Sequence, residues 1–273
     1  GSVLTNLSFS FGGMMRAAGF PKKSMMVNII GVGLNFILDP IFIFGFGMGI
    51  QGAALATVIS MFVSALYVMR HFVNPKNEVH FGRDSCRLKT RISRNIVSIG
   101  LAPFLMNTAG SFVNIIMNRQ LYDTGGDLAI GAFGIINSYG AFIVMMVMGL
   151  CKGMQPIVGY NYGAKRLKRM KDTLILGIKI GTAIMCFGFL LGELFPGLLV
   201  RLFTNDETLR QIAVPGLRVV FAMYPVIGFQ IMVAQFHQSI GKAKEAIFMS
   251  LSRQIIFLIP LIYIFGKLWG LHG

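Results

Sequence analysis

Asp39 is a carboxylate within the apolar run LNFILDPIF, which covers residues 34–42. An unpaired charge in an apolar medium is among the most costly features of a chain, so Asp39 needs polar partners or a function. Asn35 precedes it by four residues, which places both side chains on one face of a helix. Carboxylate and amide oxygens are ligands for hard cations, and a carboxylate also holds a proton. The pair therefore indicates a candidate cation site.

A third polar side chain, Thr57, is expected at the same depth. The glycine-rich segment 45–51 turns the chain into an antiparallel neighbour. With a rise of about 1.5 Å per residue, Thr57 lies about 12 Å beyond Gly49 and Asp39 about 15 Å before it. We predict that Asn35, Asp39 and Thr57 bind sodium or a proton. The alternative is a structural anchor, in which these groups only hydrogen-bond one helix to another.

The composition predicts that these residues lie in a membrane. Of the 273 residues, 55% are hydrophobic and 13% are charged, and the mean hydropathy is +0.69. A net charge of +15 would suit a nucleic-acid-binding protein, but the basic residues lie in short loops between strongly apolar segments, which argues against that class. The spacing of Cys86, Cys151 and Cys186 predicts neither a disulfide framework nor a zinc site. No nucleotide-binding or hydrolase motif occurs, so we do not expect an enzyme.

The elements that must position the polar residues are apolar helices. Residues 2–15 are typical of the end of one span, and seven further stretches are long enough to cross a bilayer: about 24–45, 52–69, 95–118, 128–151, 173–195, 211–236 and 246–268. Basic loops alternate with loops that contain few basic residues. Basic loops lie on the cytoplasmic side, so the span that begins at Ser24 runs from inside to outside. The basic segments 71–94 and 165–171 act as topological signals or contact anionic lipids.

Two segments of the chain resemble each other. FGFGMGIQG at 44–52 and FGKLWGLHG at 265–273 share glycines at an offset of 221 residues, and Lys23 and Lys244 precede them at the same offset. This similarity favours a duplicated architecture, which is common in transporters. At the same offset Asp39 corresponds to Pro260 and Asn35 to Ile256, so no equivalent acid is expected in the second copy.

Three long motifs carry a resemblance to a known family. The stretch 16–60, GLCKGMQPIVGYNYGAKRLKRMK at 149–171 and GKAKEAIFMSLSRQIIFLIPLIYIFG at 241–266 are similar to segments of the multidrug and toxic compound extrusion (MATE) transporters. The resemblance implies an all-α, polytopic membrane protein with two pseudo-symmetric lobes. This chain would supply the end of helix 4 through helix 11, so we interpret it as a fragment that lacks helices at both ends. Residues 1–72 would belong to the amino-terminal lobe, 73–94 to a cytoplasmic linker and 95–273 to the carboxyl-terminal lobe.

The resemblance also implies a function. MATE transporters export organic, often cationic, drugs and toxic compounds by proton- or sodium-coupled antiport, without a cofactor, and Asn35, Asp39 and Thr57 match their amino-terminal cation site. It implies a multi-pass protein of the plasma membrane, monomeric when complete, whose partners are small molecules and the bilayer and not nucleic acid. A lipid-linked oligosaccharide flippase and a membrane scaffold without transport activity are the alternatives. Polar or adaptable side chains of the later spans are candidates for a substrate cleft, against a default role in packing or lipid contact: Asn107, Tyr139, Met145, Gln155 and Arg253.

Overall fold

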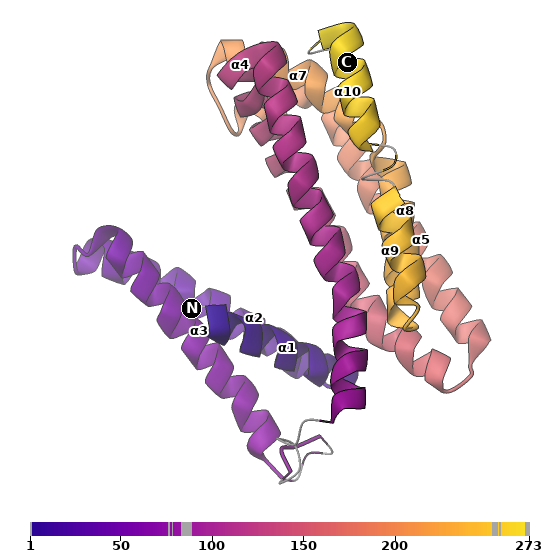
Figure 1. The fold of residues 1–273 in the computed structure, drawn as a ribbon. Coiled ribbons are helices and arrows are strands. Elements are labelled where there is room, and N and C mark those ends of the chain that lie inside the picture. The colour runs from indigo at the N-terminus through magenta and orange to yellow at the C-terminus, as the bar shows by residue number, and fades with distance from the viewer. Residues whose placement is uncertain are drawn as a thin grey trace. The chain divides into compact units, whose positions relative to one another are not determined.

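The described residues of the computed structural model form helices joined by short loops, with no strand among them (Figure 1). The structure describes residues 2–75, 77, 79–82, 89–252, 256 and 258–270. The chain divides into two compact units, Gly1–Leu88 and Lys89–Gly273. Each unit is considered by itself, as unit 1 and unit 2.

Unit 1 contains α1 (Ser2–Ala17), α2 (Pro21–Pro40), the π-helix η1 (Ile41–Gly45) and α3 (Gly49–Val73). Gly19 begins the turn into α2 with φ of 86°, a conformation that glycine adopts at little cost. Pro21 lies in the first turn of α2, where a missing N–H removes no helical hydrogen bond. The expected spans 24–45 and 52–69 thus correspond to α2 with η1 and to α3.

Pro40 marks the point where α2 changes its hydrogen-bonding pattern. Proline has no N–H to donate to the carbonyl of Phe36, so the regular ladder is interrupted there. The chain continues as η1, in which the Phe46 N–H donates to the Ile41 carbonyl, five residues earlier, at 3.0 Å. The α-helix therefore gives way after Pro40 to a short π-helical segment, a frequent feature of functional regions in helices.

Small residues allow α2 and α3 to pack closely. The buried face of α3 contains Gly52, Ala56, Ser60 and Ser64, each one turn after the last. A Cβ atom on Gly52 would lie 2.8 Å from the backbone carbonyl of Phe42, so the backbones nearly touch there. Without a hydrophobic effect between helices in lipid, such close van der Waals packing stabilises the pair.

Unit 2 begins with α4 (Thr90–Gly163), which consists of two segments. Gly126 has φ of 65° and ψ of −159°, which are not helical angles and which only glycine readily adopts. The expected spans 95–118 and 128–151 are the two segments on either side of Gly126. The remaining helices are α5 (Leu167–Leu194), α6 (Pro196–Arg201), α7 (Glu207–Phe221), α8 (Tyr224–Ser239), α9 (Ala243–Leu251) and α10 (Ile259–Trp269).

The core of unit 2 forms where the second segment of α4 meets α5, α7 and α8. Residues at helical spacing along α4 are buried against these helices: Ala132, Ile136, Tyr139, Ile143, Val147, Cys151, Met154 and Val158. Glycines bring α5 and α8 together, because a Cβ atom on Gly228 would lie 3.2 Å from the Gly181 carbonyl oxygen and 2.8 Å from Cγ of Met185. This close packing uses the same small-residue principle as unit 1.

The stretch expected as one span at 211–236 is a broken helix. α7 and α8 meet at an angle of 50° across residues 222–223. Pro225 lies in the first turn of α8, where it cannot donate to a carbonyl of α7. The stretch expected at 246–268 contains α9 and α10, and residues 253–255 and 257 between them lie outside the described part of the chain.

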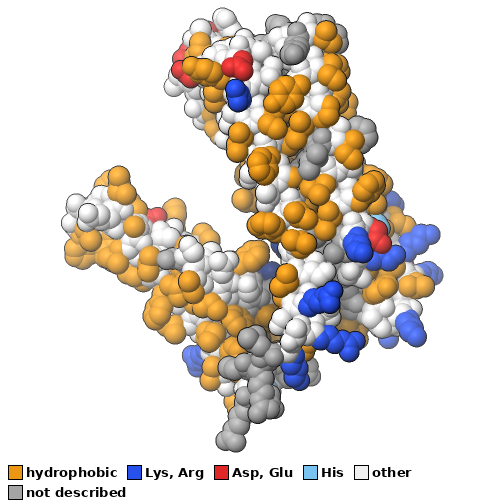
Figure 2. Space-filling model, in the orientation of Figure 1, with side chains coloured by type: hydrophobic (Ala, Val, Ile, Leu, Met, Phe, Trp, Pro, Cys, Tyr) orange, Lys and Arg blue, Asp and Glu red, His pale blue; other side chains and the backbone are white. Residues whose placement is uncertain are grey.

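Several helices are long and apolar enough to cross a membrane. Within the described residues they are α2 with η1, α3, α4 and α5, and the bent pair α7 and α8 adds a fifth candidate. In unit 2, Lys and Arg side chains gather at one end, whereas most of the visible acidic side chains lie at the other (Figure 2). Hydrophobic side chains cover the length between these ends. This distribution is typical of a protein embedded in a bilayer with its basic end in the cytoplasm.

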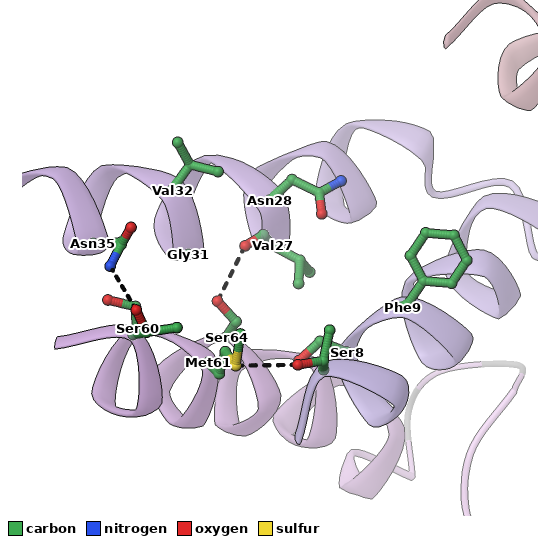
Figure 3. A pocket seen from close by; sticks show the side chains of 12 residues that line it. Ser8, Phe9, Val27, Asn28, Gly31, Val32, Asn35, Ser60, Met61 and Ser64 are labelled. Carbon is green, nitrogen blue, oxygen red and sulfur yellow. Dashed lines mark hydrogen bonds between the residues drawn. The ribbon is translucent and has the colours of Figure 1, made fainter. Parts of the chain in front are cut away.

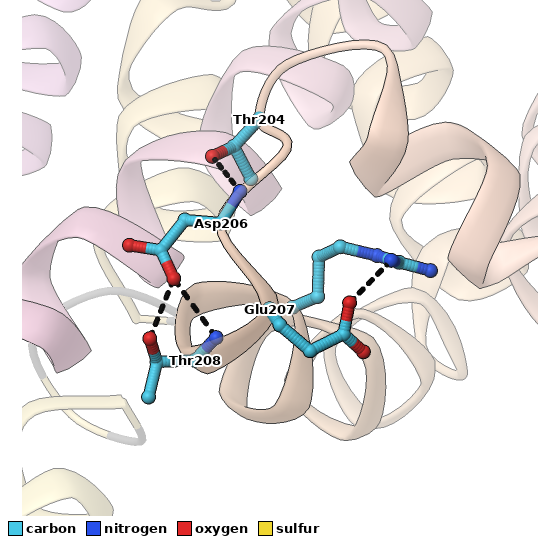
Figure 4. Close-up of polar contacts among 5 residues, drawn as sticks. Thr204, Asp206, Glu207 and Thr208 are labelled. Carbon is cyan, nitrogen blue, oxygen red and sulfur yellow. Dashed lines mark hydrogen bonds and ion pairs between the residues drawn. The ribbon is translucent and has the colours of Figure 1, made fainter.

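α7 begins with a well-formed cap outside the apolar segments (Figure 4). One carboxylate oxygen of Asp206 accepts hydrogen bonds from the hydroxyl and, at 2.9 Å, from the backbone N–H of Thr208. These bonds favour the ionised form, so the pKa of the Asp206 carboxyl lies below its usual value. The anionic cap also interacts favourably with the positive end of the α7 dipole.

Candidate functional site

Asn35 links the other two members of the polar cluster predicted from the sequence. Its Nδ2 donates to Oδ1 of Asp39 at 3.1 Å and to Oγ1 of Thr57 at 3.4 Å. The hydroxyl of Thr57 in turn donates to the Ala53 carbonyl at 2.8 Å. α2 positions the carboxylate and the amide one turn apart, and α3 positions the hydroxyl opposite them. The structure thus brings the three residues together, and their role as a cation site stays a prediction.

The charge of Asp39 is not neutralised by a protein cation within the described residues, because neither of the ion pairs found there includes it. All three side chains are half-buried. An ionised carboxylate in such a setting is stabilised by a bound metal cation, whereas protonation would remove its charge. The oxygens of Asp39, Asn35 and Thr57 are suitable ligands for a hard cation. The described residues contain no cluster of three His, Cys, Asp or Glu side chains, so a metal here would depend largely on neutral oxygens.

A pocket of about 270 Å³ adjoins the cluster between α1, α2 and α3 (Figure 3). Asn35 and Thr57 lie on its wall, together with other hydroxyl and amide side chains. The sequence interpretation did not single out these further residues, although they recur at helical spacing: Ser8, Asn28, Ser60 and Ser64. Spacing of three or four residues within an apolar helix is the signal that identifies them.

The described candidates for a substrate cleft in unit 2 all lie on α4, one of them buried and three exposed. Tyr139 is 6% exposed, and its hydroxyl donates to the Gly188 carbonyl at 3.1 Å. Its ring packs on Phe221 in the core, which corresponds to the packing alternative. Asn107, Met145 and Gln155 are exposed on the surface of α4, and Arg253 lies outside the described residues.

A charge pair joins α5 to α7. Nε of Arg218 lies 3.8 Å from a carboxylate oxygen of Glu193, and both side chains are about half exposed. Glu193 lies in the last turn of α5. An exposed pair of this length contributes little to stability. The pair does give Arg218, one of the few charged side chains within the spans, a partner of opposite charge.

The helices, their apolar surfaces and the half-buried polar cluster together define a multi-pass membrane protein with the fold of a transporter. The MatE family model matches residues 102–264, which is more than half of the chain. The chain belongs to this family of membrane transporters.

Curated relatives and solved structures are similar over nearly the whole chain. "Multidrug export protein MepA" from Staphylococcus aureus (strain NCTC 8325 / PS 47) is 33% identical over 262 residues, which are 94% of this chain and 56% of that protein. The protein of the same name from Staphylococcus saprophyticus is 29% identical, with the same coverage. A solved structure described as an outward-facing multidrug resistance MATE family transporter matches with a TM-score of 0.87 at 24% identity, over 96% of this chain and 59% of that one. The chain therefore spans between one half and two thirds of the length of these relatives.

Proposed function

We propose that this chain is part of a secondary active transporter that exports organic, often cationic, compounds in exchange for protons or sodium. The observation that supports this proposal best is the carboxylate of Asp39 within an apolar helix pair. It accepts a hydrogen bond from Asn35, and the same amide group donates to Thr57. Ionisable groups inside membrane helices commonly mark ion pathways and coupling sites. A relative that is 33% identical bears the name of a multidrug export protein, which agrees with this assignment.

In this proposal each unit contributes to one of two pseudo-symmetric lobes of an alternating-access transporter. Unit 1 supplies the coupling site, because the repeat retains no acid at the corresponding position of unit 2, where Pro260 stands. The transporter resides in the plasma membrane. It needs no nucleotide, because the ion gradient supplies the free energy of export.

The experiment replaces Asp39 by Asn in the full-length transporter. Proteoliposomes are loaded with a fluorescent organic cation such as ethidium, and efflux is followed under a pH gradient or a sodium gradient. We expect Asp39→Asn to abolish gradient-driven efflux, because a neutral amide cannot bind and release the coupling proton or sodium ion as a carboxylate does. The ion gradient that drives the unmodified protein identifies the coupling ion.

Asp172→Asn is the matched control. Asp172 is exposed in the first turns of α5 next to the basic segment 165–171, so its loss should leave efflux unchanged. Size-exclusion chromatography in detergent shows that each variant folds. Gradient-driven efflux by Asp39→Asn at the unmodified rate would contradict the proposal.

A further inference from the structure

The polar residues of α2 form one continuous stripe. Ser24, Asn28, Asn35 and Asp39 follow one another at four, seven and four residues, which keeps them on one face of the helix. Between Ser24 and Asp39 the remaining residues are apolar side chains or glycine. The stripe runs from the end of α2 that follows the basic loop toward the cluster around Asp39. Along this helix, the polar groups thus form a line and are not scattered.

A second stripe on α3 faces the first. Ser60 and Ser64 follow Thr57 at three and seven residues, and both are buried. The Ser60 hydroxyl donates to the Ala56 carbonyl at 2.8 Å, and the Ser64 hydroxyl donates across to the Val27 carbonyl of α2 at 3.3 Å. Each hydroxyl oxygen keeps lone pairs that accept hydrogen bonds.

Asn28 and Asn35 of the first stripe and the residues of the second stripe line one pocket together with α1 (Figure 3). Ser8 of α1 contributes a buried hydroxyl that has no hydrogen-bond partner among the residues that the structure describes. A buried polar atom without a protein partner is commonly satisfied by water. The pocket has a volume of about 270 Å³. A water molecule occupies about 30 Å³ of liquid, so the pocket accommodates several.

Beyond the pocket, polar residues continue toward the side of the membrane that we assign to the cytoplasm. Below Asn28, Ser24 is buried and donates to the Gly12 carbonyl at 2.8 Å. Its hydroxyl accepts from the guanidinium of Arg16, also at 2.8 Å. Arg16 belongs to the basic residues that predict the cytoplasmic face. The line of polar groups thus extends from a cytoplasmic arginine to Asp39.

We propose that this polar seam, formed by Ser8, Asn28, Ser60 and Ser64 below Asn35 and Thr57, is a hydrated path between the cytoplasm and Asp39. It gives the coupling ion access to the carboxylate from the inside, and this role rests on the proposed function. The competing explanation is packing, since small hydroxyl residues also let helices approach closely. Packing predicts no contact of these residues with water.

Thiol accessibility distinguishes the two explanations. Asn28→Cys and Ser60→Cys are made in the full-length transporter without its native cysteines and treated in inside-out vesicles with a charged methanethiosulfonate. Ile29→Cys and Val58→Cys are the matched controls, because these exposed apolar residues lie at similar depths but do not line the pocket. Only the thiolate reacts, and it forms in water, so we expect the seam thiols to react at least about tenfold faster than the controls. Equal rates at seam and control positions would overturn the proposal.

A second measurement, of efflux, tests the path even if a cysteine variant does not fold. It also separates this proposal from the proposed function. Asn28 is exposed and donates no hydrogen bond found in the structure, so Asn28→Leu should fold. It should slow gradient-driven efflux at least about threefold by placing an apolar group in the path, and Asn28→Ser should restore the rate. Unaltered efflux by Asn28→Leu would count against the path. If Asp39→Asn leaves efflux unchanged while the seam thiols react fast, Asp39 is not the coupling site. The hydrated path would still be supported by the thiol reactions.

Discussion

Asn35 organises the cluster, because one amide nitrogen serves both the carboxylate of Asp39 and the hydroxyl of Thr57. The distance of 3.4 Å to Thr57 is near the outer limit for such a bond, whereas 3.1 Å to Asp39 is ordinary. The amide is therefore held mainly by the carboxylate. In the proposed cation site, its own carbonyl oxygen would be a ligand together with the oxygens of Thr57 and Asp39.

Conservative substitutions test whether the Thr57 hydroxyl contributes to the proposed cation site. Thr57→Val keeps the shape of the side chain but removes the oxygen, whereas Thr57→Ser keeps the oxygen. A net hydrogen-bond contribution of about 0.5–1.5 kcal/mol corresponds to a two- to tenfold change in affinity. We expect Thr57→Val to shift the ion concentration for half-maximal efflux by that factor, and Thr57→Ser to leave it nearly unchanged. Indistinguishable curves for Thr57→Val and the unmodified protein would remove Thr57 from the site.

Glycine and proline decide how the helices of unit 2 meet. Gly126 divides α4 into two segments, and Pro225 separates α8 from α7. In each case a local property of one residue, a positive φ or a missing N–H, changes the direction of an apolar helix. The glycines between α5 and α8 act differently, because they determine how closely two helices approach.

The contact between α5 and α8 can be tested at Gly228. A Cβ atom there would lie 3.2 Å from a backbone carbonyl oxygen and 2.8 Å from Met185, so Gly228→Ala requires the helices to separate. Overpacking of this kind costs about 1–3 kcal/mol. We expect the Tm in detergent to fall by roughly 2–10 °C.

Gly149→Ala is the control for this effect. Gly149 is exposed on α4, and a Cβ atom added there would meet no atom within 4 Å. Alanine favours a helix over glycine, so the Tm should stay the same or rise slightly. An equal loss of stability in both variants would show that the close contact at Gly228 is not the cause.

Charged residues are distributed unevenly between the two ends of α5, and this distribution predicts the orientation of the chain in the membrane. The segment 165–171 contains Lys165, Arg166, Lys168, Arg169 and Lys171, all exposed, whereas the loop after α6 is acidic. α5 connects these two regions and is long enough to cross a bilayer. The basic region should therefore face the cytoplasm and the acidic loop the outside.

Labelling of intact cells tests this orientation. Lys168→Cys and Asn205→Cys are introduced separately into the cysteine-free full-length transporter, and a membrane-impermeant maleimide is added. We expect Asn205→Cys to be labelled in intact cells and Lys168→Cys only after permeabilisation, because α5 separates them across the bilayer. The reverse pattern would invert the topology and, with it, the side from which the polar seam opens.

The sequence by itself determined the class of the protein, most of its spans and the cluster around Asp39. Hydropathy, helical periodicity and the turn between two antiparallel helices are local properties, so Asn35, Asp39 and Thr57 could be placed together without a structure. The sequence did not reveal the break before α8, because proline within an apolar stretch permits either a kink or a break.

Only the tertiary structure decided which polar side chains face a pocket and which face the core. Tyr139 was a candidate for a cleft and lies in the core, while Ser60 and Ser64 look like ordinary small residues and line a pocket. Periodicity assigns residues to a face of a helix. It does not identify the neighbour of that face, because this depends on how segments distant in the sequence pack together.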